Sequence, residues 1–293
     1  MTTILKTDIK ELKKLFSGKV RDIYEVSKNQ WLLVTTDRIS AFDVVFSEGI
    51  PMKGAYLNRV ANHWFKTVTT IKTHIISYTP ELELPFLKNY PGIPERSILV
   101  QKMNRLPVEC IVRGYLFGSV WDEYQKHSTA SGVLLPTGIP LAGEIPEPIF
   151  TPSGKAEAGH DINITEKEFF DTVGHEIGTQ IKKVSLELYT QARNRMKEKG
   201  VILADTKFEF GLDENGSLVL VDEILTPDSS RYWVGSSYSV GKSPESFDKQ
   251  FVRDYLLSIN WNKQPPAPPL PPDIIENTRA KYEQIATIVE SLV

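Results

Sequence analysis

The chain has 293 residues, of which 41% are hydrophobic and 24% charged, and its formal net charge is −3. This composition is typical of a globular protein, without the basic excess that nonspecific nucleic-acid binding needs. A single cysteine, Cys110, excludes an intramolecular disulfide and indicates a reducing compartment. No segment approaches transmembrane length and the N-terminus lacks the apolar core of a signal peptide, so we expect a cytoplasmic protein without nucleic-acid or membrane partners.

The first part of the chain is rich in β-prone segments. Residues 20–26 and 31–35 predict two strands joined by a turn at residues 27–30, and residues 98–102 predict a further buried strand. Residues 56–65 carry apolar side chains at helical spacing. These elements predict a β-rich N-terminal lobe.

A short glycine loop precedes the first of these strands. Gly18 permits close backbone approach to a phosphate, and Lys19 and Arg21 offer positive charge. A lysine beside a glycine is more often a plain turn, so the loop alone is a weak signal. Its position favours a nucleotide clamp, because the lobe ends in a hinge-like segment at residues 102–104 against which adenine could lie. We therefore predict an ATP-binding lobe over residues 1–104.

The remaining residues, 105–293, predict a larger α+β lobe that binds substrate and magnesium. Residues 108–112 alternate as a strand, whereas residues 132–159 are dense in proline and glycine and predict a long irregular segment of the kind that lines active sites. Thr165 and Glu168 form a capping box that opens a long helix.

That helix is expected to run towards Gly200, with breaks at Gly174 and Gly178. A proline-rich run at residues 264–272 must be extended, because proline cannot enter a helix interior. We expect a stiff strap across the surface; the alternative is a ligand for an aromatic-grooved domain. Residues 274–292 predict a final amphipathic helix that packs back onto the body.

The most informative segment begins at residue 203, where Asp205, Lys207 and Glu209 alternate along one face of a strand. If Asn215-Gly216 forms a two-residue type I′ turn, Glu209 lies directly opposite Asp222 on the returning strand. Two facing carboxylates repel each other unless a cation lies between them. A magnesium ion shared with substrate phosphates would remove that repulsion.

The alternative is an exposed hairpin whose charges face solvent, with Lys207 neutralising its neighbours. The register is also an assumption, since a slip of one residue moves Asp222 to the other face. The loop that follows, residues 226–233, is rich in groups that bind anions. Together the hairpin and the loop indicate an enzyme that handles phosphate.

Seven ordered blocks of this sequence resemble the SAICAR synthetase family, over nearly the whole chain. The blocks are residues 18–24, 36–43, 107–113, 118–119, 155–161, 205–211 and 222–231. The length and the proline strap resemble the monomeric, yeast-like branch of the family. Two positions depart from the family pattern: Phe117 replaces a small residue and Gly154 replaces a threonine.

The resemblance implies an α+β fold of two lobes with the active-site cleft between them, the N-terminal lobe being an antiparallel nucleotide clamp of the kinase or ATP-grasp kind. It implies that ATP drives ligation of L-aspartate to the carboxylate of carboxyaminoimidazole ribonucleotide (CAIR), through an acyl phosphate, in purine biosynthesis. ATP would be the co-substrate and Mg²⁺ the cofactor of a monomeric ligase.

The resemblance also assigns residues to the site. Glu209 and Asp222 would hold magnesium, and the residues expected at the reacting groups are Lys207, Asp205 and Arg231. Those expected to bind ATP are Gly18, Lys19, Val20, Arg21, Lys102, Met103 and Glu109. Those expected to bind CAIR or aspartate are Asp37, Ser40, Arg113, Ser119, Lys207, Asp228, Ser230 and Arg231.

Two other functions stay open at this point. A small-molecule kinase with a similar clamp would phosphorylate an alcohol, with Asp205 or Asp228 as the base. A nucleotide sensor or scaffold without catalysis would have no need for the Glu209–Asp222 pair.

Overall fold

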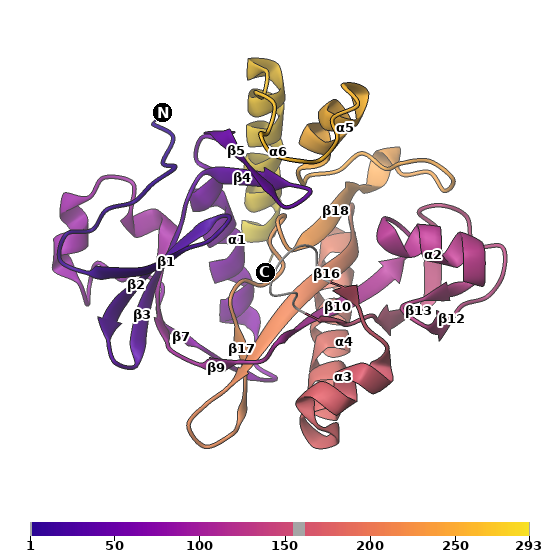
Figure 1. The fold of residues 1–293 in the computed structure, drawn as a ribbon, viewed down its shortest axis with the longest axis horizontal. Helices are drawn as coiled ribbons and strands as arrows, with labels where there is room; N and C mark the ends of the chain where they lie inside the picture. Colours follow the sequence, from indigo (N-terminus) through magenta and orange to yellow (C-terminus); the bar gives the residue numbers. More distant parts are fainter. Residues whose placement is uncertain (1, 155–161, 293) are drawn as a thin grey trace.

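Two β-sheets organise the chain in this computed structural model, which describes residues 2–154 and 162–292 (Figure 1). The first sheet is antiparallel and has the order β1-β2-β3-β8-β7. Its strands are β1 (Lys13–Ser17), β2 (Arg21–Ser27), β3 (Gln30–Thr35), β7 (Ile75–Ser77) and β8 (Ser97–Gln101). The strands predicted at residues 20–26, 31–35 and 98–102 are confirmed to within one residue.

The second sheet is built around β16 (Val201–Leu212), which pairs with β10 (Val108–Tyr115), β17 (Leu218–Val221) and β18 (Ser230–Val234). Its other strands are β6 (Lys72–Thr73), β9 (Asn104–Arg105), β13 (Glu144–Phe150), β14 (Ser153–Gly154) and β15 (Ile162–Asn163). β6 pairs with β17 in parallel, so a strand from the N-terminal part of the chain enters this sheet.

Six α-helices surround the sheets in the described part of the chain: α1 (Lys53–Thr67), α2 (Ser119–His127), α3 (Glu166–Val173), α4 (His175–Glu198), α5 (Gln250–Ser258) and α6 (Pro272–Glu290). Two small hairpins, β4 (Arg38–Ala41) with β5 (Val44–Gly49) and β11 (Thr129–Ala130) with β12 (Val133–Leu134), complete the strands. Short 3₁₀ turns occupy Pro85–Asn89, Pro94–Arg96 and Gly235–Ser237.

The prediction that residues 132–159 are irregular is wrong over β12, β13 and β14. β13 contains two prolines, Pro146 and Pro148, yet pairs with β10 at Val112↔Phe150 and Arg113↔Ile149. β10 is its only partner among the described strands, so β13 is an edge strand. Proline is tolerated there because the missing N–H faces away from the ladder.

The capping box is confirmed, and it opens α3. Thr165 accepts a hydrogen bond from the Glu168 N–H, and the Glu168 carboxylate accepts one from the Thr165 N–H at 2.7 Å. Gly174, with φ 83°, separates α3 from α4, whereas Gly178 lies inside α4 and does not break it. A Cβ at Gly178 would approach the Phe170 ring to 2.5 Å, so this glycine lets α3 pack against α4.

The main hydrophobic core joins the two halves of the chain. Val60 and Trp64 of α1 pack in one buried cluster with Phe208 of β16 and Tyr282 of α6. The boundary predicted at residues 104 and 105 therefore does not coincide with a gap in the core, and it stays a prediction.

The proline-rich segment has no regular structure up to Pro271, and α6 begins at Pro272. Leu270 is buried in a cluster with Phe46 of β5 and Val252 of α5. The segment therefore packs on the body at Leu270, and its role as a strap stays a prediction.

The hairpin between β16 and β17 has a different register from the prediction. Leu212 pairs with Leu218, and Glu209 therefore lies opposite Val221 rather than Asp222. The turn spans residues 213–217, because the Asp213 carboxylate accepts hydrogen bonds from the N–H groups of Asn215 (3.0 Å) and Ser217 (2.8 Å). This Asx turn contains one residue more than a type I′ turn. Each residue of β16 therefore lies opposite the β17 residue one position earlier than predicted.

Candidate active site

An apolar cavity of about 330 Å³ lies beside the first sheet. Its lining includes Ile23, Trp31 and Val100 of the sheet, and Met103 from the predicted hinge. Val221 and Asp222 close it from the second sheet. Such a cavity, with apolar walls and few polar groups, suits a flat aromatic ligand. The Lys102 ammonium lies over the Trp31 ring, 5.5 Å from its centroid, and Lys102 is not among the lining residues.

The glycine loop closes tightly between β1 and β2. The Gly18 N–H donates to the Arg21 carbonyl at 2.7 Å, and the Val20 carbonyl accepts from the Thr36 N–H at 2.8 Å. The Lys19 side chain is about half exposed and pairs with Asp43. The Arg21 side chain reaches the end of β17, where it pairs with Asp222 and with Glu223 at 2.7 Å.

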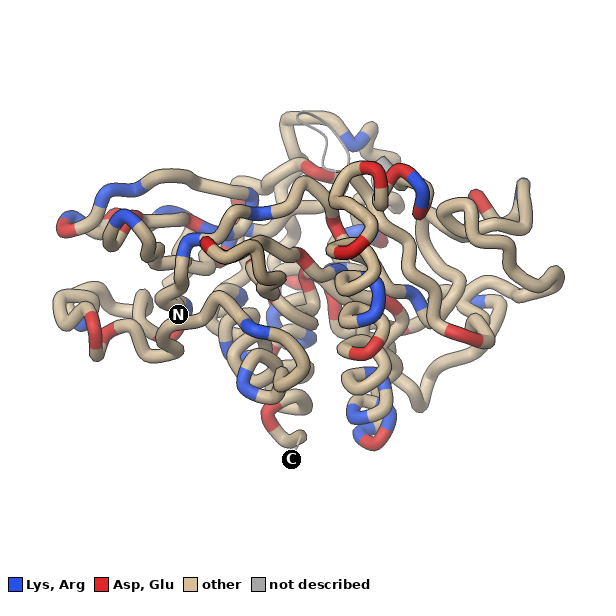
Figure 2. Tube along the Cα trace, turned by 90° about the horizontal axis from the view of Figure 1, so that it is seen from below, with Lys and Arg blue, Asp and Glu red and all other residues tan. Residues whose placement is uncertain are grey.

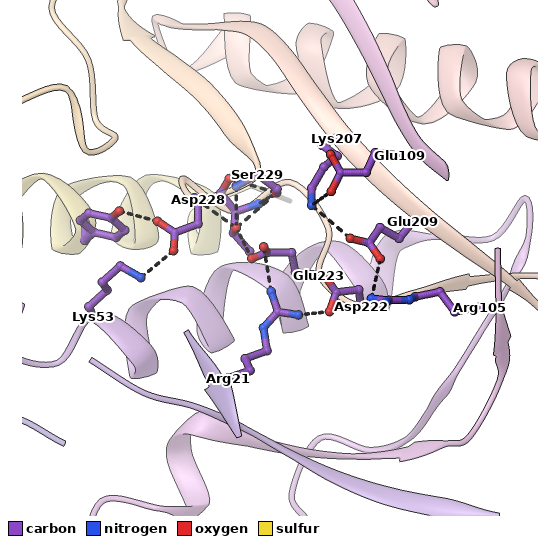
Figure 3. A network of polar contacts seen from close by, with 12 residues as sticks. Arg21, Lys53, Arg105, Glu109, Lys207, Glu209, Asp222, Glu223, Asp228 and Ser229 are labelled. Atoms are coloured by element: carbon purple, nitrogen blue, oxygen red, sulfur yellow. Dashed lines mark hydrogen bonds and ion pairs between the residues drawn. The ribbon is translucent and has the colours of Figure 1, made fainter. Parts of the chain in front are cut away.

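Four acidic side chains gather where β10, β16 and the end of β17 meet (Figure 3). We call Glu109, Glu209, Asp222 and Glu223 the carboxylate cluster. The Lys207 ammonium lies 2.7 Å from Glu109 Oε1 and 3.1 Å from Glu209 Oε1. Burial by itself lowers the pKa of Lys207, but the charges of Glu209, Glu109 and Asp222 outweigh it and raise that pKa far above 10.5. Lys207 is therefore a fixed positive charge.

Arg105 adds a further cation, with its guanidinium 3.4 Å from Glu209 Oε2. Charges of both signs are spread along the whole trace (Figure 2), so this concentration of acids is a local feature rather than a consequence of net charge. Within the described residues, no group of three or more histidine, cysteine, aspartate or glutamate side chains has the geometry of a metal site. A metal bound by Glu209 and Asp222 would thus need oxygen ligands from phosphate and water.

Two polar cavities, of about 170 Å³ and about 750 Å³, lie next to each other on the other side of Lys207. Both include Arg231 and Arg253 in their linings. Of the residues predicted to bind CAIR or aspartate, those lining the smaller cavity are Arg113, Lys207, Asp228, Ser230 and Arg231. Those lining the larger cavity are Ser40, Ser119 and Arg231. The fold therefore brings seven of the eight together from five segments of the chain.

Asp205 fixes two of these cations. Its Oδ2 accepts from Arg113 at 3.1 Å and also from Arg231, and all three side chains are mostly buried. Thr151 accepts a further hydrogen bond from Arg113 Nε at 3.0 Å. The paired guanidinium groups form a preset site for an anion.

Phe117, the first departure from the family pattern, packs beneath Arg231. Its ring centroid lies 5.7 Å from the guanidinium carbon of Arg231 and 5.4 Å from the Trp233 ring. The aromatic face therefore supports the cation that the site uses. At Gly154, the second departure, a Cβ would meet only Ile164 at 3.5 Å, so packing does not demand glycine there.

Asp37 does not line either polar cavity, and its placement contradicts the expected contact with substrate. Its side chain is fully buried and accepts hydrogen bonds from the N–H groups of Ile4 (2.8 Å) and Gly54 (2.9 Å). Arg96, itself buried, pairs with it at 2.6 Å. Asp37 therefore joins three segments of the N-terminal part and has a structural role.

Three cations of the larger cavity were not predicted: Lys249, Arg253 and Lys263. Lys249 and Arg253 lie four residues apart at the start of α5, so they share one helix face. The spacing of four residues is visible in the sequence, but no neighbouring residue indicates that α5 lies at the site. The block at residues 155–161, quoted for the family resemblance, lies outside the described residues.

Comparison with known proteins agrees with this geometry. The family model described as SAICAR synthetase matches residues 14–268. The phosphoribosylaminoimidazole-succinocarboxamide synthase of Thermodesulfovibrio yellowstonii is 49% identical over 290 residues, covering 98% of this chain and 99% of its own. The corresponding protein of Polaromonas sp. is 48% identical over 299 residues, with the same coverage.

Among solved structures, the SAICAR synthase of Saccharomyces cerevisiae complexed with SAICAR superposes with a TM-score of 0.88. It is 42% identical, and the match covers 98% of each chain. The predicted likeness to the yeast enzyme is confirmed, and the two bacterial relatives show that this form is not confined to yeast. The fold, too, is that of a SAICAR synthase. The chain therefore belongs to the SAICAR synthetase family.

Proposed function

We propose that the apolar cavity holds the base of ATP, and that the two polar cavities hold CAIR and L-aspartate. The reaction follows from the family: ATP-dependent ligation of L-aspartate to the carboxylate of CAIR, which gives SAICAR, ADP and phosphate in purine biosynthesis. The carboxylate cluster is the observation that supports this assignment of ligands to cavities. Asp222 of the cluster lines the apolar cavity, and Lys207, which the cluster surrounds, lines the smaller polar cavity. Phosphoryl transfer requires such a junction between nucleotide and acceptor.

On the nucleotide side, Met103 would contact the base, with Lys102 beside it. Gly18, Lys19, Val20 and Arg21 would surround the phosphates, and Glu109 would orient Lys207 towards them. The apolar lining and the position of Arg21 support this assignment. Lys19 would have to leave Asp43 to reach a phosphate, and its exposure makes that exchange inexpensive.

Glu209 and Asp222 would hold magnesium. Their hard oxygen donors suit this ion. Both carboxylates raise the pKa of Arg21 and of Lys207, so both act on the same two cations. In the structure each carboxylate pairs with a cation, Asp222 with Arg21 and Glu209 with Lys207. When bound, the metal would neutralise charge on the phosphates of the nucleotide.

On the substrate side, Arg113, Ser119 and Arg231 would bind the ribonucleotide phosphate and carboxylate. Arg113 and Arg231 share the Asp205 anchor, and Ser119 begins α2, whose N-terminus favours an anion. The remaining polar contacts would come from Ser40, Asp228 and Ser230.

The chemistry would proceed through an acyl phosphate. A carboxylate is a poor electrophile because its oxygen leaves badly. Attack of a CAIR carboxylate oxygen on the γ-phosphorus makes phosphate the leaving group and releases ADP. The neutral amine of aspartate then attacks the carbonyl carbon, and phosphate departs. Lys207 would offset the charge on the transferred phosphoryl group.

The kinase alternative is less favoured by the environment of Asp228. Burial by itself raises the pKa of this carboxyl group, but Lys53, the charge of Lys249 and the Tyr282 hydroxyl outweigh burial and hold that pKa well below its usual range. Such a carboxylate is a weak base towards an alcohol. The comparisons with known proteins likewise favour the ligase.

We also propose a monomer, on the likeness to the yeast-like branch, and a cytoplasmic location. None of the helices in the described ranges is long and apolar enough to cross a bilayer. Light scattering of the purified chain at several concentrations tests the monomer directly.

A coupled assay of ADP release tests the function. We expect continuous, multiple-turnover release of ADP only when CAIR and aspartate are both present, together with an amide product seen by mass spectrometry. ADP release with an alcohol acceptor and no dependence on aspartate would indicate the kinase instead.

Arg231→Lys is expected to weaken CAIR binding about tenfold or more, because it keeps the charge but loses the planar fork and the contact with Phe117. ADP binding should stay near normal. Calorimetry with each ligand separates the two. Equal weakening of both would mean that Arg231 acts on the fold or on the nucleotide side.

A further inference from the structure

Helix α6 reaches the active site through a buried hydroxyl group. Tyr282 is fully buried, and its hydroxyl donates to Asp228 Oδ1 at 2.6 Å (Figure 3, where Asp228 is labelled). Burial and the neighbouring carboxylate raise the pKa of Tyr282 well above 10, so the hydroxyl keeps its proton and remains a donor. Asp228 lies on the wall of the smaller polar cavity.

The other oxygen of Asp228 is held from α1. The Lys53 ammonium lies 2.6 Å from Asp228 Oδ2, and Lys53 is fully buried. The same ammonium lies 5.5 Å from the centroid of the Tyr282 ring. Both oxygens of one cavity-lining carboxylate are thus fixed from behind, by two helices that pack on each other in the main core.

The segment that carries Asp228 also carries Ser230 and Arg231. Its turn is closed locally, since the Ser229 N–H donates to the Thr226 carbonyl at 3.1 Å. Immediately after the turn, Ser230 and Arg231 enter β18 opposite Thr206 and Asp205. The contacts of Asp228 with Tyr282 and Lys53 therefore add a third attachment to a segment already held by its turn and by β18.

We propose that Tyr282 and Lys53 are positioning residues for CAIR binding, which act through Asp228 and through the segment at residues 226–231. The inference rests on the proposed function, since it assumes that this cavity binds CAIR. It makes the C-terminal helix part of the active site rather than only a cover for the core.

Tyr282→Phe tests the inference because it keeps the buried ring and removes one hydrogen bond to a charged group. The dissociation constant for CAIR, measured by calorimetry, should rise on the order of tenfold. That for ADP should stay within about twofold, because the nucleotide lies in the other cavity.

Tyr56→Phe is the matched control. Tyr56 also lies between α1 and α6, but its hydroxyl donates to Glu283 at 3.1 Å, outside both polar cavities. Its loss should change the dissociation constant for CAIR by less than about twofold, with a melting temperature close to that of Tyr282→Phe.

An Asp228→Asn background completes the design. There, Tyr282→Phe should change CAIR affinity less than about twofold, because its partner is already altered.

An unchanged CAIR constant in Tyr282→Phe would overturn the inference. The same loss in the presence and absence of Asp228 would do so too, as would a variant that fails to fold, since the hydroxyl would then act elsewhere. The proposed function fails separately, if the wild-type chain forms no amide from CAIR and aspartate.

Discussion

Asp222→Asn is expected to lower turnover about a hundredfold or more while the chain remains folded, since changes even to outer partners of a metal cost 10- to 100-fold. The variant removes one charged ligand from the proposed magnesium site, so that Glu209 is the remaining carboxylate ligand. It also frees Arg21 from one of its two carboxylate partners. Both effects weaken the binding of the nucleotide phosphates next to the acceptor carboxylate.

Steady-state rates over a range of magnesium concentrations are the measurement, with circular dichroism to confirm the fold. We expect the magnesium dependence to shift to higher concentration, which a merely structural loss would not produce. Glu214→Gln is the matched control, because it removes one charge from the exposed tip of the same hairpin, where Glu214 accepts a hydrogen bond from Asn29 at 3.2 Å. A wild-type rate for Asp222→Asn at ordinary magnesium would refute the two-carboxylate site.

Much of the fold is readable from the sequence because local rules and burial agree. The β2 and β3 runs, the capping box of α3 and the amphipathic period of α6 all lie where the patterns predict. Each signal comes from residues close together in the chain. Tertiary contacts then reinforce what the local pattern already favours.

The hairpin register was not readable, and the reason is physical. β16 is buried on both faces over most of its length, so hydrophobic alternation does not select one register. The register is set by Asp213, because its carboxylate accepts hydrogen bonds from two backbone N–H groups and lengthens the turn. Glu209 and Asp222 nevertheless act on the same two cations, and the magnesium site stays a prediction.

Among the candidate site residues, the error at Asp37 is equally instructive. A conspicuous aspartate in a polar motif can serve a site or a buried ion pair, and sequence alone does not separate them. Its partner Arg96 is 59 residues away, and the pair becomes visible only when α1 and the first sheet are packed together. The network of Lys53, Tyr282 and Asp228 was missed for the same reason, since it joins three distant segments.

Lys207→Met is expected to slow phosphoryl transfer about a hundredfold or more, because an uncharged side chain cannot offset the charge that develops on the phosphoryl oxygens. Lys207 is suited to this task, because its ammonium is held between Glu109 and Glu209 and its pKa is raised, so it stays charged at every working pH. The competing interpretation is structural. Lys207 could serve only to separate the two carboxylates, and its loss would then lower stability rather than rate.

Two measurements separate these readings of Lys207. CAIR labelled with oxygen-18 in its carboxylate should transfer label to the released phosphate in the wild type, because the oxygen that bridges carbon and phosphorus leaves with the phosphoryl group. In Lys207→Met the labelled phosphate should appear far more slowly in single-turnover experiments, at a temperature where circular dichroism shows a folded chain. Lys182→Met is the control, because Lys182 also holds a carboxylate, that of Glu166 at 2.7 Å, but on the surface of α4. Unlabelled phosphate from active wild-type enzyme would exclude the acyl phosphate and, with it, the role assigned to Lys207.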